Sequence, residues 1–295
     1  MRSTAACQAN LLMKHLTWLF ILVPVLVGCA PLGDATQTAF ATNIPSFSEE
    51  IIDSKGVVMR FIPAGEFIMG NDRAKSEDDA DEKPEHRVYL DAFYIDKYEV
   101  TNSLYAACVD EGVCEPQVSL DSYTRSNYYG NSQFDEYPVI SVDWDMANTY
   151  CEWRGAHLPT EAQWEKAARG TDARTYPWGE GIDCNKANYQ PCIGDTAPVG
   201  SYENGVSPYG LYNMAGNVME WVADWYSETY YQTSPASNPL GPDSGSAPNR
   251  VLRGGSWIST DNMVRAASRH WPWNAFGASF ANIETGFRCA LRMSP

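Results

Sequence analysis

The sequence predicts a mixed α+β domain of short strands, short helices and long loops over residues 47–295. Three observations lead to this prediction. The chain holds 22 Gly and 18 Pro, which interrupt long regular elements. Three segments carry helix caps and stops, and several short apolar runs are typical of strands. The 10 Trp, 17 Tyr and 10 Phe supply enough apolar surface for a core, which excludes a disordered chain.

Each of the three expected helices begins at a side-chain oxygen that can accept a hydrogen bond from the first turn, and each stops at a glycine. The helices are expected at residues 101–111 with Thr101 as the cap, 143–154 with Asp143, and 160–169 with Thr160. The last of them opens with Thr160 and Gln163 in the spacing of a capping box.

Strands are expected to be short because turn residues recur along the chain. They are expected at residues 57–62, 66–69, 87–95, 251–253 and 286–291. The stretch from 171 to 250 is expected to consist of loops. A loop-rich domain of this length needs disulfides or bound cations for its stability.

The net charge and the distribution of apolar residues each exclude one class of protein. Lys and Arg number 21 against 37 Asp and Glu, so the net charge is 21 − 37 = −16. A chain this acidic lacks the basic face that phosphate contacts require, so no nucleic-acid partner is expected. Only one long apolar run exists, near the N-terminus, which excludes a polytopic membrane protein. The acidic surface resists aggregation and repels anionic partners, and a monomer is expected.

The N-terminus has the pattern of a bacterial lipoprotein signal peptide over residues 1–28. The apolar run Leu16–Gly28 is too short to span a bilayer, and Cys29 follows it where a lipid would be attached. Residues 29–46 would then be a lipidated, flexible tether. Met13 makes a more typical start than the first residue. An uncleaved anchor and a plain signal peptide are the alternatives.

A lipid on this cysteine would make membrane lipid a partner of the chain. It would place the domain at the bacterial cell envelope, on the outer membrane or the periplasmic face.

Six cysteines lie within the expected domain, and an even number in an exported protein indicates disulfides. Two pairs are close in sequence, Cys108–Cys114 and Cys184–Cys192. The remaining two, Cys151 and Cys289, would form a long-range disulfide. A zinc site has less support, because no CxxC pair and no nearby histidine accompanies these cysteines.

Two further regions are rich in oxygen ligands. Residues 72–85 carry seven acids and three bases without fixed spacing, so a solvated loop is expected there. Residues 209–221 combine glycines, Asn213 and Glu220, and oxygen donors in such a turn suit Ca²⁺. The alternative is a packed Gly-Asn turn with Glu220 at the start of a helix.

Ten segments of the chain resemble, in order, those of the sulfatase-modifying-factor family, whose founding member is the formylglycine-generating enzyme. The segments are Gly65–Gly70, Glu99–Asn102, Tyr137–Trp144, Leu158–Glu165, Ala168–Gly170, Tyr176–Gly179, Ala197–Ser201, Gly210–Trp221, Arg250–Trp257 and Gly286–Ala290. They follow the family order, and the resemblance runs from about residue 57 to about residue 292, nearly the whole expected domain.

The resemblance implies a C-type-lectin-like fold of the formylglycine-generating-enzyme type. It implies a disulfide between the second helix and the segment that ends at Ala290. It also implies calcium sites. The first would use Asn213, Glu220 and the carbonyls of Gly216 and Val218, and a second would use Asn188, the carbonyl of Tyr189 and Asp195.

The chain departs from the family at the copper site. The formylglycine-generating enzyme holds Cu(I) through two thiolates, and the resemblance places them at Ser259 and Val264. Neither a hydroxyl nor an isopropyl group suits Cu(I), so copper is not expected. Ser256 matches the family, while Met219 replaces a usual tryptophan and Glu284 a usual asparagine.

Two classes of function follow. The first is an envelope lipoprotein whose domain binds a ligand or peptide, or acts as an accessory domain, through a cleft with Ser256, Ser259, Arg269 and Glu284. The second is an oxidoreductase of the family, active in formylglycine-type oxidation or siderophore-maturation-like chemistry, with Glu284 as a general base. Formylglycine formation itself would need an unrecognised copper site.

The aromatic residues between 270 and 280 resemble a ligand-display surface of the family and could equally belong to the core. They are His270, Trp271, Trp273, Phe276 and Phe280, together with the polar Asn274.

Overall fold

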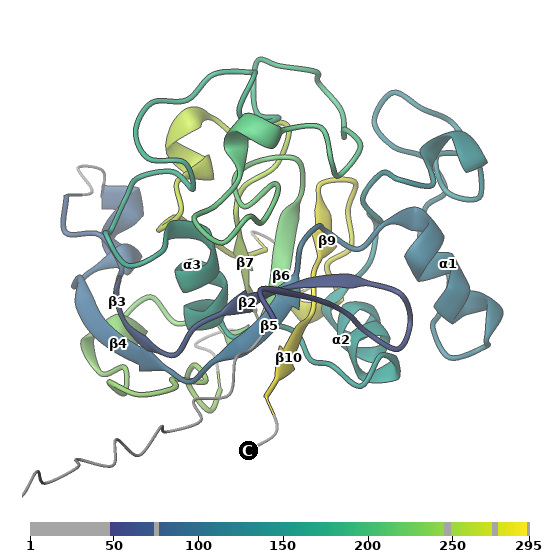
Figure 1. Ribbon diagram of the computed structural model, residues 1–295. Coiled ribbons are helices and arrows are strands. Elements are labelled where there is room, and N and C mark those ends of the chain that lie inside the picture. Colours follow the sequence, from purple (N-terminus) through teal and green to yellow (C-terminus); the bar gives the residue numbers. More distant parts are fainter. Residues whose placement is uncertain (1–47, 74–76, 245–248, 273–276, 294–295) are drawn as a thin grey trace, which may run out of the picture. The chain divides into compact units, whose positions relative to one another are not determined.

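The computed structural model describes residues 48–73, 77–244, 249–272 and 277–293 (Figure 1). The expected signal peptide, Cys29, Met13 and the tether lie outside the described residues, and so do Trp273, Asn274 and Phe276. No helix within the described ranges is both long and apolar enough to cross a bilayer.

The three expected helices are present, and their caps are confirmed. They are α1 (Asn102–Asp110), α2 (Trp144–Trp153) and α3 (Glu161–Arg169). The side chains of Thr101, Asp143 and Thr160 each accept a hydrogen bond from the first turn of their helix. Thr160 and Gln163 form the complete capping box. These helices are predictable because their boundaries depend on local hydrogen bonds.

The strands form two four-stranded sheets and one hairpin (Figure 1). The first sheet has the order β1-β2-β5-β10, with β1 Glu50–Ile52, β2 Val58–Ile62, β5 Phe93–Asp96 and β10 Ala290–Arg292. The hairpin pairs β3 Gly65–Met69 with β4 His86–Leu90. The other sheet has the order β8-β7-β6-β9, with β6 Met219–Trp225, β7 Arg250–Arg253, β8 Arg269–His270 and β9 Thr285–Phe287.

Two expected strands are in fact pairs of strands. The chain turns at Asp91 and Ala92, so the expected strand 87–95 is split between β4 and β5. The expected strand 286–291 is likewise split between β9 and β10, and in both cases the two halves belong to different sheets.

The central strand β6 was missed by the sequence analysis, which expected loops there and considered a helix start at Glu220. β6 pairs with β7 antiparallel and with β9 parallel, and Figure 1 shows it between them. Four of its seven residues are buried, including residues on both faces, so the strand lacks the alternation of a half-exposed strand.

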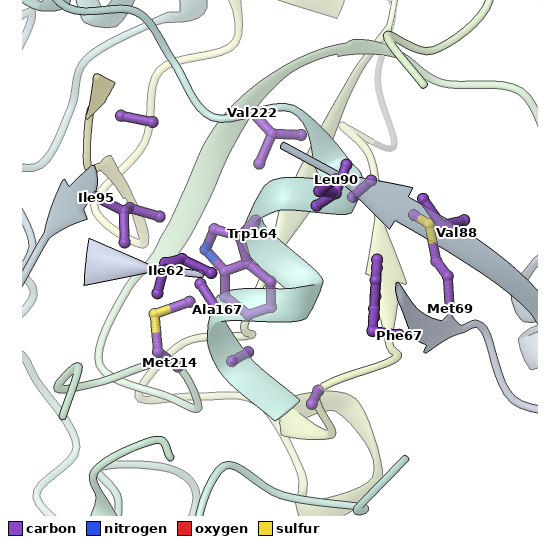
Figure 2. Close-up of a cluster of buried hydrophobic side chains, with 14 of the residues drawn as sticks. Ile62, Phe67, Met69, Val88, Leu90, Ile95, Trp164, Ala167, Met214 and Val222 are labelled. Atoms are coloured by element: carbon purple, nitrogen blue, oxygen red, sulfur yellow. The ribbon is translucent and has the colours of Figure 1, made fainter. Parts of the chain in front are cut away.

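The main core surrounds Trp164 of α3, whose side chain is fully buried. Figure 2 shows Ile62, Ile95, Met214 and Val222 around its indole ring, with Phe67, Met69, Val88 and Leu90 on the other side of the helix. A second cluster contains Tyr105, Tyr150, Trp221 and Phe287. These two clusters fix α3 and β6 as the rigid base for the residues discussed below.

All three expected disulfides are present. Cys108–Cys114 and Cys184–Cys192 close loops with sequence separations of 6 and 8 residues. Cys151–Cys289 joins residues separated by 138 positions and connects α2 with the residue before β10.

The expected solvated loop at residues 72–85 is wrong for its second half. Asp81 and Glu82, at the end of the short helix η1 (Glu77–Glu82), are buried. Glu82 accepts two hydrogen bonds from Arg265, at 2.7 and 2.8 Å. Asp81 lies 3.8 Å from the guanidinium of Arg269. Since buried charges must be paired, these distant arginines explain why the acids leave the solvent.

Candidate functional site

Three residues of the expected cleft lie together. Ser256 N donates to Ser259 Oγ at 2.9 Å, and Ser256 Oγ donates to Glu284 Oε2 at 3.2 Å. The two serine hydroxyls are 3.4 Å apart. The turn is made by Gly254 and Gly255, which both have positive φ. A Cβ at Gly255 would lie 2.7 Å from Val264 Cγ1, so only glycine fits there.

The electrostatics of this cluster favour a protonatable carboxyl. Both serines are buried and Glu284 is half-buried. Burial raises the pKa of Glu284, and the hydrogen bond from Ser256 opposes that rise in part. Hydroxyls and a carboxyl at this spacing can donate to and accept from a polar ligand.

Apolar side chains flank the cluster. Tyr123 has 65% of its surface exposed, and its ring contacts that of Trp257 in a tilted arrangement with the ring centres 5.2 Å apart. Ile258, which directly follows Trp257, is 46% exposed. Exposed large apolar side chains beside buried polar groups are typical of a binding surface. Tyr123 was missed by the sequence analysis, because only the fold brings it next to Trp257.

Arg269 does not belong to the cluster, and its assignment to the cleft was wrong. Its side chain is fully buried and donates to both carboxylate oxygens of Glu161, at 2.7 and 3.0 Å. It also donates to the carbonyl oxygen of Asp81 at 2.9 Å. A guanidinium with these partners cannot turn toward a ligand without leaving Glu161 buried and unpaired.

The described aromatic residues that follow Arg269 face the core. His270 is buried, its Nε2 is 2.8 Å from the carbonyl oxygen of Met263, and burial lowers its pKa to about 4. Trp271 stacks on Tyr226 with the ring centres 4.3 Å apart. Phe280 packs against the second core cluster. The core alternative therefore holds for these three residues.

The positions of the family's copper thiolates do not fit Cu(I). Ser259 carries a hydroxyl that accepts a hydrogen bond from Ser256 N. Val264 is fully buried and packs against an aromatic cluster that includes Tyr176 and Tyr189. All six cysteines in the described part of the chain are in disulfides, so none of them offers a free thiolate.

The first implied calcium site has a free oxygen ligand. Asn213 is buried, and its Oδ1 has no hydrogen-bond partner among the described residues. Its Nδ2 donates to Glu99 Oε2 at 2.7 Å. Glu220 is also buried and accepts hydrogen bonds from Arg288 Nε and Nη2, both at 2.7 Å, and from Trp164 Nε1 at 2.8 Å. The unpaired oxygen of Asn213 suits a hard cation, whereas the carboxylate of Glu220 is already paired with the guanidinium of Arg288.

Glu99 lies beside this site and was not assigned to it from the sequence. It is buried, and both Asn213 and Asn217 donate to its carboxylate. Burial and the charge of Glu220 raise the pKa of Glu99 to about 8, while Arg288 and the two amides lower it only in part. One sequence feature could have pointed to Glu99: within the motif Glu99–Asn102 it is an acid just before a capped helix.

We expect the stability of the protein to fall as pH rises from about 5 to 8 because of Glu99. In this window the folded state holds a proton on Glu99, with a pKa of about 8 against 4.5 for an ordinary glutamate, and the unfolded state does not. The loss is at most about 1.4 kcal/mol per pH unit. Chemical denaturation of wild type and Glu99→Gln at several pH values measures it. The variant should lose less stability over this window, and equal slopes would contradict the assignment.

The second implied calcium site has the same two features as the first, an unpaired amide oxygen and a carboxylate that is already paired with a guanidinium. Asp195 Oδ2 accepts hydrogen bonds from Thr124 N and Oγ1 and from Ser122 Oγ, at 2.6 to 2.8 Å. Its Oδ1 accepts from Thr196 N and lies 3.2 Å from Arg125 Nη1. Burial raises the pKa of Asp195, but these hydrogen bonds together lower it below its usual value. A guanidinium thus already supplies the positive charge, although Asn188 Oδ1 is buried and unpaired.

The side chains that could bind a metal ion are not clustered in the described residues. In the ranges that the structure describes, no group of three or more His, Cys, Asp or Glu side chains is placed to hold a metal ion. A calcium site here would therefore depend on amide and carbonyl oxygens.

Comparison with known proteins places this geometry in a family. Residues 50–293 match the family described as the sulfatase-modifying factor enzyme 1-like domain. The formylglycine-generating enzyme of Streptomyces coelicolor is 36% identical over 286 residues, which cover 78% of this chain and 87% of the relative.

The first curated relatives it matches are chlamydial proteins, and the chain spans only about 37–38% of their length. One of them, named serine/threonine-protein kinase Pkn1, from Chlamydia trachomatis, is 40% identical over 245 residues, or 79% of this chain.

Among solved structures, PvdO from Pseudomonas aeruginosa aligns with a TM-score of 0.68 and 26% identity, covering 83% of this chain and 98% of that chain. The fold is thus the C-type-lectin-like fold that the resemblance implies. The chain belongs to the sulfatase-modifying factor enzyme 1-like domain family and has the fold of the formylglycine-generating enzyme.

Proposed function

We propose that this chain is an envelope lipoprotein whose domain binds a peptide or small ligand at the Ser256 cluster and performs no copper-dependent oxidation. One observation carries the proposal. The two positions that the family uses to bind copper are occupied by Ser259 and by the buried Val264, and the described cysteines are in disulfides. A domain that retains the fold without the copper ligands can still bind a ligand at its surface.

The surface around the cluster supports binding. The exposed Tyr123 and Ile258 offer apolar contact, while Ser256 and Glu284 offer hydrogen bonds nearby. An apolar rim with a few fixed polar groups is the usual composition of a ligand site. The half-buried carboxyl of Glu284 favours a ligand with a hydrogen-bond donor or a positive charge.

The pattern around Cys29 supports the location. A lipid on that cysteine would hold the domain at the membrane surface. The disulfides support an exported protein, because such bonds persist in oxidising compartments.

A peptide library displayed on phage tests the binding proposal, with the full chain in detergent as the immobilised target. We expect enriched peptides to bind wild type at least ten times more tightly than Tyr123→Ser or Glu284→Gln. Tyr89→Ser is the matched control, because Tyr89 is an exposed tyrosine on β4. Peptides that bind all variants equally, or no enrichment at all, would contradict the proposal.

We also propose that the domain binds one calcium ion through Asn213 Oδ1, Glu220 and the carbonyl oxygens of Gly216 and Val218. The unpaired Asn213 Oδ1 supports this site. The ion would serve the structure of the turn, since extracellular calcium sites commonly order loops.

Calcium titration by calorimetry should give one equivalent per chain. Asn213→Ala should abolish binding, and Asn185→Ala, a change at an exposed asparagine, should leave it intact. Two equivalents would contradict the interpretation of Asp195, and none would contradict the first site.

The alternative function is an oxidoreductase of the family. The 36% identity to a formylglycine-generating enzyme favours it. In that case Glu284 would act as a general base toward a group bound beside Ser256, because burial raises its pKa above that of an ordinary glutamate.

A further inference from the structure

A cavity of about 360 Å³ lies at the C-terminal end of α3, and none of the residues that line it belongs to the Ser256 cluster. Its walls come from the turn after β3, the segment after α3 and the segment around the short helix η5 (Asp261–Val264). The volume is at the lower end of the range of small-molecule sites. A ligand that fills it would have the size of an amino acid or a monosaccharide.

The walls are rich in guanidinium groups. Arg73, Arg169, Arg174 and Arg265 line the cavity, and Asp79 is the one acid among its described lining residues. The chain as a whole has a net charge of −16, so this concentration of positive charge runs against the composition of the protein. Arginine presents a planar fork of donors that matches carboxylate and phosphate groups.

Carboxylates pair with three of these arginines, Arg174, Arg265 and Arg169. Asp172 accepts from Arg174 Nε and Nη2 at 2.8 and 2.7 Å. Glu82 accepts from Arg265 Nη1 and Nη2 at 2.8 and 2.7 Å, and Asp79 lies 3.1 Å from Arg265 Nη2. These pairs reduce the net charge but hold the side chains in place before any ligand binds. Preorganisation of this kind lowers the entropic cost of binding.

Arg169, the last residue of α3, keeps one buried donor without a partner among the described residues. It is buried, and its Nη1 donates to the carbonyl oxygen of Gly70 at 2.7 Å and to Glu165 Oε1 at 2.8 Å. Its Nε is buried and has no hydrogen-bond partner within the described residues. An unpaired buried donor on a charged group is costly. An unpaired donor at the wall of a cavity indicates that the side chain serves to bind a ligand rather than to stabilise the fold.

We propose that this cavity binds a small ligand through an oxyanion, a carboxylate, phosphate or sulfate group, held between the guanidinium groups of Arg73, Arg174 and Arg169. The amide of Asn71 also lines the wall and can complete its hydrogen bonds. The site is independent of the proposed peptide surface.

Calorimetry on the full chain in detergent, at constant ionic strength, tests this with three probes: inorganic phosphate, sulfate and acetate. We expect saturable binding of at least one probe, with an affinity at least tenfold weaker in Arg174→Gln and in Arg73→Gln. These side chains are partly or largely exposed, so both variants should fold, which circular dichroism checks. Arg87→Gln is the matched control, because Arg87 is an exposed, ion-paired arginine on β4 outside the cavity.

The ranking of the three probes identifies the chemistry of the ligand. No saturable binding of any probe would overturn the proposal, and so would equal weakening by Arg87→Gln. Glu284→Gln should leave anion binding intact, so failure of this site and failure of the peptide surface are distinguishable.

Discussion

Removal of the Cys151–Cys289 disulfide should lower the free energy of unfolding by about 5 kcal/mol. The bond joins residues 138 positions apart, and its main effect is to restrict the unfolded chain. It also connects α2 with the end of the domain. Urea denaturation of the double variant Cys151→Ala/Cys289→Ala, compared with wild type, measures the difference.

The matched control is Cys184→Ala/Cys192→Ala. This bond closes a loop of only 8 positions, so the same entropy relation gives a loss of about 2.5 kcal/mol. Equal losses in the two double variants would contradict an origin in the unfolded chain.

The replacement Arg288→Met should lower the free energy of unfolding by about 3–5 kcal/mol. Arg288 is fully buried and donates to both oxygens of Glu220, and also to the carbonyl oxygens of Asp96 and Tyr212. Its loss leaves Glu220 in the core with only Trp164 Nε1 as a donor, beside the protonatable Glu99. An uncompensated buried carboxylate is the source of the cost.

The double variant Arg288→Met/Glu220→Met separates charge from packing. If the unpaired carboxylate causes the loss, the double variant should be more stable than Arg288→Met alone. A double variant that is less stable than Arg288→Met would assign the effect to packing instead.

The parts of the fold that depend on local chemistry were predictable from sequence. The caps Thr101, Asp143 and Thr160 mark the helices within one or two residues, because each cap acts within a single turn. The disulfides followed from the number and spacing of the cysteines.

The parts that depend on distant partners were not predictable. β6 is buried on both faces, so its periodicity gives no strand signal, and its pairing with β9 joins residues far apart in sequence. Arg269 appeared available for the cleft because nothing near it in sequence indicates its partner, Glu161. Glu82 appeared solvated for the same reason.

The candidate site also has a part that was predictable from sequence and a part that depends on distant partners. The motif around Gly254 and Gly255 pointed to Ser256, and the fold then brought Glu284 to it as expected. The exposed ring of Tyr123 reaches the site only through the tertiary structure. The hydrogen bond and the ion pair that engage the carboxylate of Asp195 come from Thr124 and Arg125. These two residues belong to a loop that no sequence motif marks.

Activity toward a cysteine peptide tests the central claim most directly. The chain, produced without residues 1–28 and loaded with Cu(I) under a competing chelator, is incubated in air with a peptide from a sulfatase motif. The Streptomyces coelicolor enzyme serves as the positive control. Our account predicts no sub-micromolar copper binding and no aldehyde in the peptide mass spectrum. Conversion of the cysteine to formylglycine would contradict it.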